Sequence, residues 1–239
     1  MHVEKHNPVG DVVPAAIPKT ARILMSRNEI ATLCFKAARG AGMSWGHAEE
    51  AGQAAAWLAL YGLDGPKSLA AHLQGAAGKS WQDVCPDVRP GLWETAAGTP
   101  LCPISLGATL CDFAALPDTP LANEGLETGP VSRPLLVLPF LSAVAEALEK
   151  PVRLSWPGGD IDLGPEGQIS GATEALAKAE TERLHIRTGT LVGETTRKPV
   201  MAPVGSETLE FLNALAMKTT VPPSDRSRAG AGGGTSDND

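Results

Sequence analysis

The amino-acid sequence predicts an α+β fold in which an N-terminal three-helix unit packs with a small mixed or antiparallel β-sheet. Apolar residues recur at helical spacing in three successive segments between residues 26 and 76, and the connections between these segments are short. Further along, the glycine-rich turn 157–159 separates the segments RLSW and DIDL, which is typical of a β-hairpin. The apolar content of 43% is that of a globular protein, so a core can form.

The first helix is predicted to begin after Ser26. The sequence SRNE at 26–29 has the capping-box pattern, in which the Ser26 side chain accepts from the backbone N–H of Glu29 and the Glu29 side chain reaches back to the Ser26 N–H. Gly40 and Gly42 then favour a helix end. Between these signals, one apolar stripe is formed by Ile30, Leu33, Cys34, Ala37 and Ala38.

Two more helices are expected before residue 78. One runs from Ser44 to about Tyr61 and ends at Gly62. The next opens at Gly65-Pro66, because a proline at the first helical position lacks only an N–H that would have no partner there. The inner face of this third helix is predicted to consist of Leu69, Ala70, Leu73 and Ala76.

The segment 78–134 contains eight prolines, which we take to exclude long helices. We expect a strand within 104–113, a buried strand at 135–138 and an amphipathic helix from about 140 to 148.

The hairpin is predicted to have strands at 152–156 and 160–163. A helix at 172–180 and a strand at 183–188 are expected to follow, and residues 189–205 to be mostly irregular. Ser206 is expected to cap a last helix with Leu209, Leu212 and Leu215 on its apolar face.

These elements predict three regions along the chain. Residues 1–24 mix proline, glycine and charge without periodicity and are expected to form an extended or flexible leader. Residues 25–217 are expected to form a single α+β domain. Residues 218–239 form a Gly-rich acidic C-terminal tail, which cannot bury enough apolar area to order itself.

Charge and composition disfavour several classes of partner. The formal net charge is −7 and no dense Lys/Arg run is present, so no nucleic-acid partner is expected. No apolar stretch approaches the roughly 20 residues of a membrane span, and no secretory signal is recognisable. The four cysteines lack CxxC spacing, so reduced thiols and a cytoplasmic location are expected.

The densest polar cluster, GMSWGHAEE at 42–50, lies at a predicted helix start, where free N–H groups favour anions. Its candidate ligand-binding residues are Ser44, Trp45, His47 and Glu50. The alternative is structural: Ser44 caps the helix, the glutamates complement its dipole and Trp45 packs on a neighbour. His47 and Glu50 alone do not make a metal site, so no metal is predicted, and the known catalytic motifs are absent, so catalytic residues and cofactors stay unknown.

The tail could enter a groove on a partner or on a second copy of the chain, because glycine backbone fits narrow spaces. The alternative is a solvated coil. A dinucleotide-binding interpretation of GAGGG fails because no strand precedes it. Arg226 and Arg228 could hold the tail or bind a carboxylate. The candidate partner-binding residues are Gly230, Gly232, Gly233, Gly234, Asp237, Asn238 and Asp239.

The segment NEIATLCFKAARGAGMSWGHAEEAGQAAAWLALYGLDG at 28–65 and the ending VPPSDRSRAGAGGGTSDND resemble an uncharacterised bacterial family catalogued as a domain of unknown function, family 3726. This resemblance implies a bacterial cytoplasmic setting and no catalytic residue. The helical opening is also similar to that of the non-Rossmann malate/L-lactate dehydrogenases, but the glycines and aspartate at 62–65 are followed by Pro66 and lack the histidine of those enzymes.

Two functions remain open from the sequence. One is a non-catalytic accessory or interaction subunit of a metabolic enzyme complex, with the tail contacting a protein partner or forming a homo-oligomer. The other is a small-molecule enzyme or ligand-binding protein that recognises an anionic metabolite, a carboxylate or a phosphate.

Overall fold

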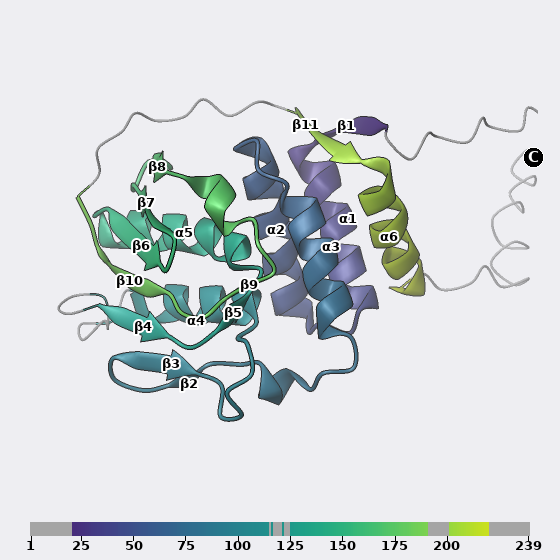
Figure 1. Cartoon of the computed structure of the whole chain (residues 1–239). Helices are drawn as coiled ribbons and strands as arrows, with labels where there is room; N and C mark the ends of the chain where they lie inside the picture. Colours follow the sequence, from purple (N-terminus) through teal and green to yellow (C-terminus); the bar gives the residue numbers. More distant parts are fainter. Residues whose placement is uncertain (1–20, 115, 117–120, 122–124, 191–200, 220–239) are drawn as a thin grey trace, which may run out of the picture.

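The computed structural model describes residues 21–114, 116, 121, 125–190 and 201–219. The predicted α+β class is confirmed. One part of the molecule is a layer of the helices α1, α2, α3 and α6, and the other contains a seven-stranded mixed sheet with α4 and α5 (Figure 1). The chain leaves the helical layer after α3, builds the sheet, and returns to the layer through β11 and α6.

The three N-terminal helices form where the sequence predicts them. They are α1 (Arg27–Gly40), α2 (Trp45–Leu60) and α3 (Gly65–Ala76). The capping box of α1 is complete, with the Ser26 backbone N–H donating to Glu29 Oε2 at 2.8 Å. Ser44 caps α2, and Asp64 caps α3 ahead of Pro66. Each helix start is therefore fixed by a local side chain.

The two ends of the described chain meet on the helical layer. β1 (Arg22–Ser26) pairs antiparallel with β11 (Met201–Gly205), and α6 (Ser206–Ala216) follows directly and packs on α1. Residues 22–24 of the expected leader thus lie in a strand, and the prediction of irregular structure is wrong for 201–205. Each strand is short and finds its partner far along the chain, so local pattern does not reveal the pair. Ser206 is the first residue of α6 and not its cap.

The main sheet has the strand order β2-β3-β4-β10-β6-β7-β8, in which only β3 and β4 run parallel. The predicted hairpin is confirmed as β6 (Val152–Trp156) and β7 (Gly159–Leu163), with Leu154 opposite Ile161. The other strands are β2 (Asp87–Val88), β3 (Leu92–Glu94), β4 (Leu126–Thr128), β8 (Ile169–Gly171) and β10 (His185–Thr188). A separate antiparallel pair joins β5 (Val131–Ser132) to β9 (Glu180–Thr181).

The strand predicted within 104–113 is wrong, because α4 (Pro103–Ala114) occupies this segment. Pro103 is the first residue of the helix, where its missing N–H costs nothing, and the Leu106 N–H donates to the Cys102 carbonyl at 2.9 Å. The buried residues Leu106, Leu110 and Ala114 recur at helical spacing. Prolines in this region therefore bound a helix instead of excluding one.

Two other predictions need correction. Residues 134–137 form the 3₁₀ turn η2 (Pro134–Val137), which leads directly into α5 (Leu138–Leu148), so the strand predicted at 135–138 is wrong. An apolar run of four residues cannot be assigned by periodicity alone. In place of the helix predicted at 172–180, the chain forms the short 3₁₀ turn η3 (Thr173–Leu176). Similar turns are η1 (Trp81–Asp83) and η4 (Met217–Thr219).

The helices approach closely where glycine replaces a larger side chain. A Cβ atom on Gly52 of α2 would lie 2.6 Å from the Ala31 carbonyl oxygen of α1, and one on Gly40 would overlap the Leu215 carbonyl oxygen of α6. On the other side of the molecule, the Phe140 ring of α5 lies over Gly107 of α4. α2 also contacts α4 and α5, which joins the helical layer to the second part.

Replacing Gly40 with alanine should push α6 away from α1. The added methyl group meets backbone, which cannot rotate aside, so we expect G40A to lose about 1–3 kcal/mol of unfolding free energy. In G75A the methyl group meets nothing within 4 Å, and this exposed helical glycine is the matched control, expected to be neutral or up to about 1 kcal/mol more stable. Urea denaturation measures both. Equal midpoints for the two variants would contradict the close α1–α6 contact.

Candidate functional site

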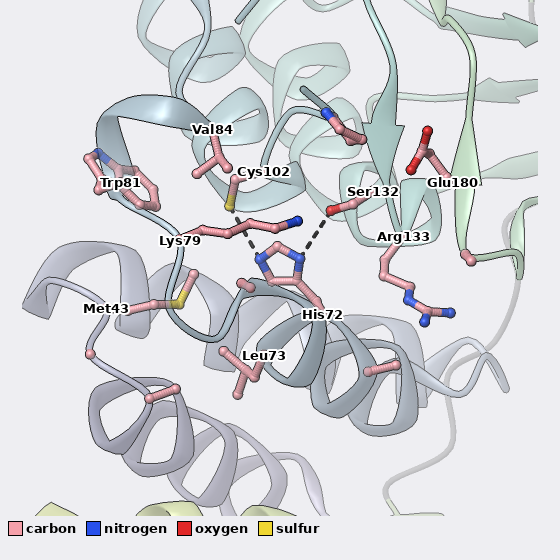
Figure 2. Close-up of a pocket in the computed structure, with 17 residues that line it drawn as sticks. Met43, His72, Leu73, Lys79, Trp81, Val84, Cys102, Ser132, Arg133 and Glu180 are labelled. Atoms are coloured by element: carbon pink, nitrogen blue, oxygen red, sulfur yellow. Dashed lines mark hydrogen bonds between the residues drawn. The ribbon is translucent and has the colours of Figure 1, made fainter. Parts of the chain in front are cut away.

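A cavity of about 270 Å³ lies between the helical layer and the second part of the molecule. Its helical wall comes from α3 and from the turn that follows α1, and its other walls come from the segment 79–84, from Cys102 and from the β5–β9 pair (Figure 2). Binding sites are commonly found at such junctions between structural units. The cavity is lined by Ala41, Gly42, Met43, Ala71, His72, Leu73, Gly75, Ala76, Lys79, Trp81, Val84, Pro100, Cys102, Ser132, Arg133, Ala179 and Glu180.

His72 is the central polar group of this cavity. It belongs to the buried face of α3 and is only 6% exposed. Its ring joins two side chains from the second part of the molecule: Nε2 lies 3.4 Å from Cys102 Sγ, and Nδ1 lies 3.1 Å from Ser132 Oγ (Figure 2). Cys102, His72 and Ser132 therefore form a continuous hydrogen-bonded chain across the junction.

Cys102 directly precedes Pro103, the first residue of α4, and the backbone N–H groups of Ser105 and Ile104 lower the pKa of its thiol. Because the Leu106 N–H donates to the Cys102 carbonyl, Cys102 occupies the N-cap position of this helix. Ser132 is held beside it because the backbone N–H of Ser132 donates to the Leu101 carbonyl at 3.1 Å. This backbone hydrogen bond to Leu101 thus brings the Ser132 and Cys102 side chains to the same imidazole ring.

Both titratable members of the chain are neutral at pH 7. Burial, together with the positive charges of Lys79 and Arg133, lowers the pKa of His72 to about 4. Burial raises the pKa of the Cys102 thiol to about 11, against the opposing effect of the two backbone N–H groups. A thiol and a neutral imidazole are therefore in contact, instead of a thiolate and an imidazolium.

Two cations and one carboxylate surround the histidine. The Lys79 side chain extends over the His72 ring towards Ser132, and Arg133 and Glu180 lie on the side of β5 and β9 (Figure 2). Within the described part of the chain, neither Lys79 nor Arg133 forms a salt bridge. Arg133 has a φ of 44°, in the left-handed region that non-glycine residues seldom adopt and that is frequent at binding sites.

Gly42 and Met43 of the predicted cluster at 42–50 line this cavity, but its candidate ligand-binding residues do not. Ser44 caps the helix and contacts His47, with 2.8 Å between Ser44 Oγ and His47 Nδ1. His47 packs on Trp81, a residue of the cavity rim, at 4.2 Å between ring centroids. Burial lowers the pKa of His47. His47 thus adjoins the cavity through Trp81.

Trp45 and Glu50 lie elsewhere. Trp45 is 65% exposed and packs edge-on against Phe35, beside the Arg39 guanidinium and an open groove between α1 and α2. Burial, followed by the charges of Glu49 and Asp112, raises the pKa of Glu50. Arg226, Arg228 and the tail residues from Gly230 to Asp239 lie outside the described residues, so their predicted roles stay predictions.

Sequence reasoning missed His72, Lys79, Cys102, Ser132 and Arg133. One local signal was available for Cys102. A polar or thiol-bearing residue directly before a proline, followed by apolar residues at helical spacing, is typical of a helix N-terminus. The remaining residues are separated by tens of positions and carry no shared motif.

Among the described residues, no group of three or more His, Cys, Asp or Glu side chains is arranged to hold a metal ion. None of the helices in this part of the chain has the length and apolar character needed to cross a bilayer.

Comparison with known proteins identifies one family. Residues 25–102 match the sequence model of the family described as "Protein of unknown function (DUF3726)", which confirms the resemblance of the segment 28–65 to this family. The matched region contains the segment 28–65 as well as His72 and Cys102, whereas Ser132 and Arg133 lie beyond it. No curated protein matches the chain.

The stability of the protein should rise with pH between about 4 and 6.5 on account of His72. The folded state keeps this ring neutral down to its pKa of about 4, whereas the unfolded chain binds a proton below the ordinary pKa of 6.5. The unfolded state therefore gains more protons as the pH falls through this window. As the pH falls from 6.5 to 4, we expect the unfolding free energy to decrease by about 3 kcal/mol. Above pH 6.5 the contribution of His72 should be constant.

Urea denaturation of the protein and of H72Q at several pH values measures this effect. Carboxylates also titrate in this pH range, but they are the same in both proteins, as are Lys79, Arg133, Glu180 and Cys102 around the ring. The difference between the two proteins in how unfolding free energy changes with pH is therefore due to His72. The same slope in both proteins would show that His72 is not held neutral by burial.

Proposed function

We propose that this protein binds a small anionic metabolite, with a carboxylate or a phosphate group, in the cavity around His72. The observation that carries the proposal is the pair of cations, Lys79 and Arg133, which line the cavity and make no salt bridge within the described part of the chain. Lys79 is exposed and Arg133 is half-buried, so both charged groups are free to form charge-assisted hydrogen bonds with an anion that enters the cavity.

The two cations suit different parts of such a ligand. An arginine guanidinium presents two parallel N–H groups that fit a carboxylate or a phosphate, whereas a lysine ammonium acts as a point charge. Glu180 on the same wall would accept a hydrogen bond from a hydroxyl or ammonium group of the ligand. Two cations against one carboxylate leave the cavity with a net attraction for anions.

The size and the apolar wall of the cavity define the rest of the ligand. A volume of about 270 Å³ is at the low end for binding sites, so the ligand is a small metabolite and not a dinucleotide. Met43, Leu73, Trp81 and Val84 provide apolar surface on the side of the cavity away from Arg133 and Glu180 (Figure 2). The ligand therefore combines one anionic end with a short organic body.

This proposal keeps the anionic ligand expected from the sequence but assigns it to other residues. The accessory-subunit function depends on the C-terminal tail, whose residues from 220 onwards lie outside the described part of the chain, and it stays a prediction. Both functions are compatible in one molecule, since the cavity and the tail involve different segments.

Removing either cation should weaken anion binding. We expect K79Q and R133Q each to raise the dissociation constant for succinate or inorganic phosphate by about tenfold or more, because each variant loses a charge-assisted hydrogen bond. K150Q is the matched control, since Lys150 is an exposed lysine after α5 that does not line the cavity. Isothermal titration calorimetry measures all four proteins.

The histidine NMR signals locate the bound anion. Binding in the cavity should shift the His72 ring resonances more than those of His47. A shift confined to His47 would move the site to the start of α2, and the absence of heat and of shifts with both anions would contradict the proposal.

A further inference from the structure

We propose that Cys102 is a nucleophile for acyl transfer, with His72 as its general base and Ser132 as the residue that orients the imidazole. The substrate class is an ester or thioester of a small acid that also bears an anionic group. This inference rests on the proposed function for its substrate class, because the same cavity would bind the anionic end.

The geometry contains the three parts that such chemistry needs. A nucleophile must lie within reach of a base, and a third group must hold the base in place. The Sγ–Nε2 distance of 3.4 Å and the Nδ1–Oγ distance of 3.1 Å supply both contacts. Distances in this range are typical of catalytic groups in ligand-free proteins and shorten when substrate binds.

The three side chains come from three separate elements and meet in one cavity. His72 belongs to α3, Cys102 precedes α4 and Ser132 belongs to β5. Figure 2 shows the Cys102 sulfur pointing at the ring from one side and the Ser132 hydroxyl meeting the other nitrogen. Because Cys102 is 2% exposed, an acyl group reaches its sulfur through the cavity and not from open solvent.

The other three cysteines, all in the described part of the chain, have different surroundings. Cys34 is fully buried in the helical core. Cys85 accepts a hydrogen bond from the Ser105 hydroxyl at 3.5 Å, and Cys111 donates to the Phe140 carbonyl at 3.7 Å. These thiols serve as internal controls in the same molecule, since Cys102 alone among them contacts an imidazole.

The reaction is balanced with water as the only co-reactant. The reactive tautomer of His72 donates its Nδ1–H to Ser132 Oγ and accepts the Cys102 S–H at Nε2. As sulfur bonds to the acyl carbon, its proton moves to Nε2, the bond from that carbon to the leaving oxygen or sulfur breaks, and the leaving group takes the proton from Nε2. Water then attacks the thioester, its proton passes to Nε2 and on to Cys102 as the C–S bond breaks, and the free acid departs.

The charges in the cavity favour an anionic substrate for this step. Protonated His72 forms next to Lys79 and Arg133, whose positive charges oppose it. A bound carboxylate or phosphate offsets these charges, so the imidazolium is less costly when an anionic substrate is present. The substrate thus contributes to the basicity of the histidine that activates the thiol.

The test uses two chromogenic esters: mono-4-nitrophenyl succinate, which is anionic, and 4-nitrophenyl acetate, which is neutral. We expect a burst of nitrophenolate with the anionic ester and a succinyl group on Cys102, identified by peptide mass spectrometry. C102A should abolish the burst. H72Q should slow acylation by about 100-fold or more, which is the usual contribution of a general base.

Variants of Ser132 distinguish a role in orienting the His72 ring from a role in folding. S132A should lower kcat with little change in KM, and S132T, which keeps a hydroxyl, should restore part of the rate. Circular dichroism and thermal unfolding check that each variant folds. If H72Q fails to fold, the distribution of the acyl group over the four cysteines of the unmodified protein still decides the question.

The outcomes separate this inference from the proposed function. Phosphate binding that depends on Lys79 and Arg133, together with acylation of Cys102 no faster than that of Cys85 and Cys111, would overturn the nucleophile and leave the anion site intact. Acylation of Cys102 at equal rates by both esters, without phosphate binding, would support the nucleophile and refute the anion site.

Discussion

The pairing of β1 with β11, reinforced by α6 against α1, is the constraint on which the rest of the structure depends. It ties the segment after residue 200 to the first described strand, so the whole of the sheet and α4–α5 is held as an insertion between α3 and β11. This insertion then lies against α3. In that arrangement His72 of the helical layer meets Cys102 and Ser132, and Lys79 and Arg133 border one cavity.

The sequence predicts those parts of the fold whose signals are local. Capping residues and glycines mark the first three helices within one or two residues, and the hairpin after residue 152 follows from its turn. Among the wrong predictions, the strand within 104–113 was expected because proline was taken to exclude a helix that it in fact begins, and the strand at 135–138 was expected from an apolar run too short to assign by periodicity. The β1–β11 pair could not be predicted, because register between distant strands is set by packing and not by neighbouring residues.

The candidate site is even harder to predict from local sequence than the fold. His72, Cys102 and Ser132 belong to no motif within their own segments. Their side chains meet only in the folded chain, where segments that are distant in the sequence come into contact. The cluster at the start of α2 attracted attention because its polar residues are consecutive, yet Ser44 and His47 contact each other and the helix start. The run of consecutive polar residues at the start of α2 thus caps a helix. The residues of the cavity, in contrast, are far apart in the sequence.

The return of the chain to α1 also has a consequence during protein synthesis. The helices α1–α3 leave the ribosome while β11 and α6 are still to be made, so the surface that α6 covers remains open to water for about ten seconds at usual translation rates. Contacts between such distant segments also slow the search for the native topology. Until the last strand and α6 arrive, the apolar surface of such a nascent chain favours aggregation.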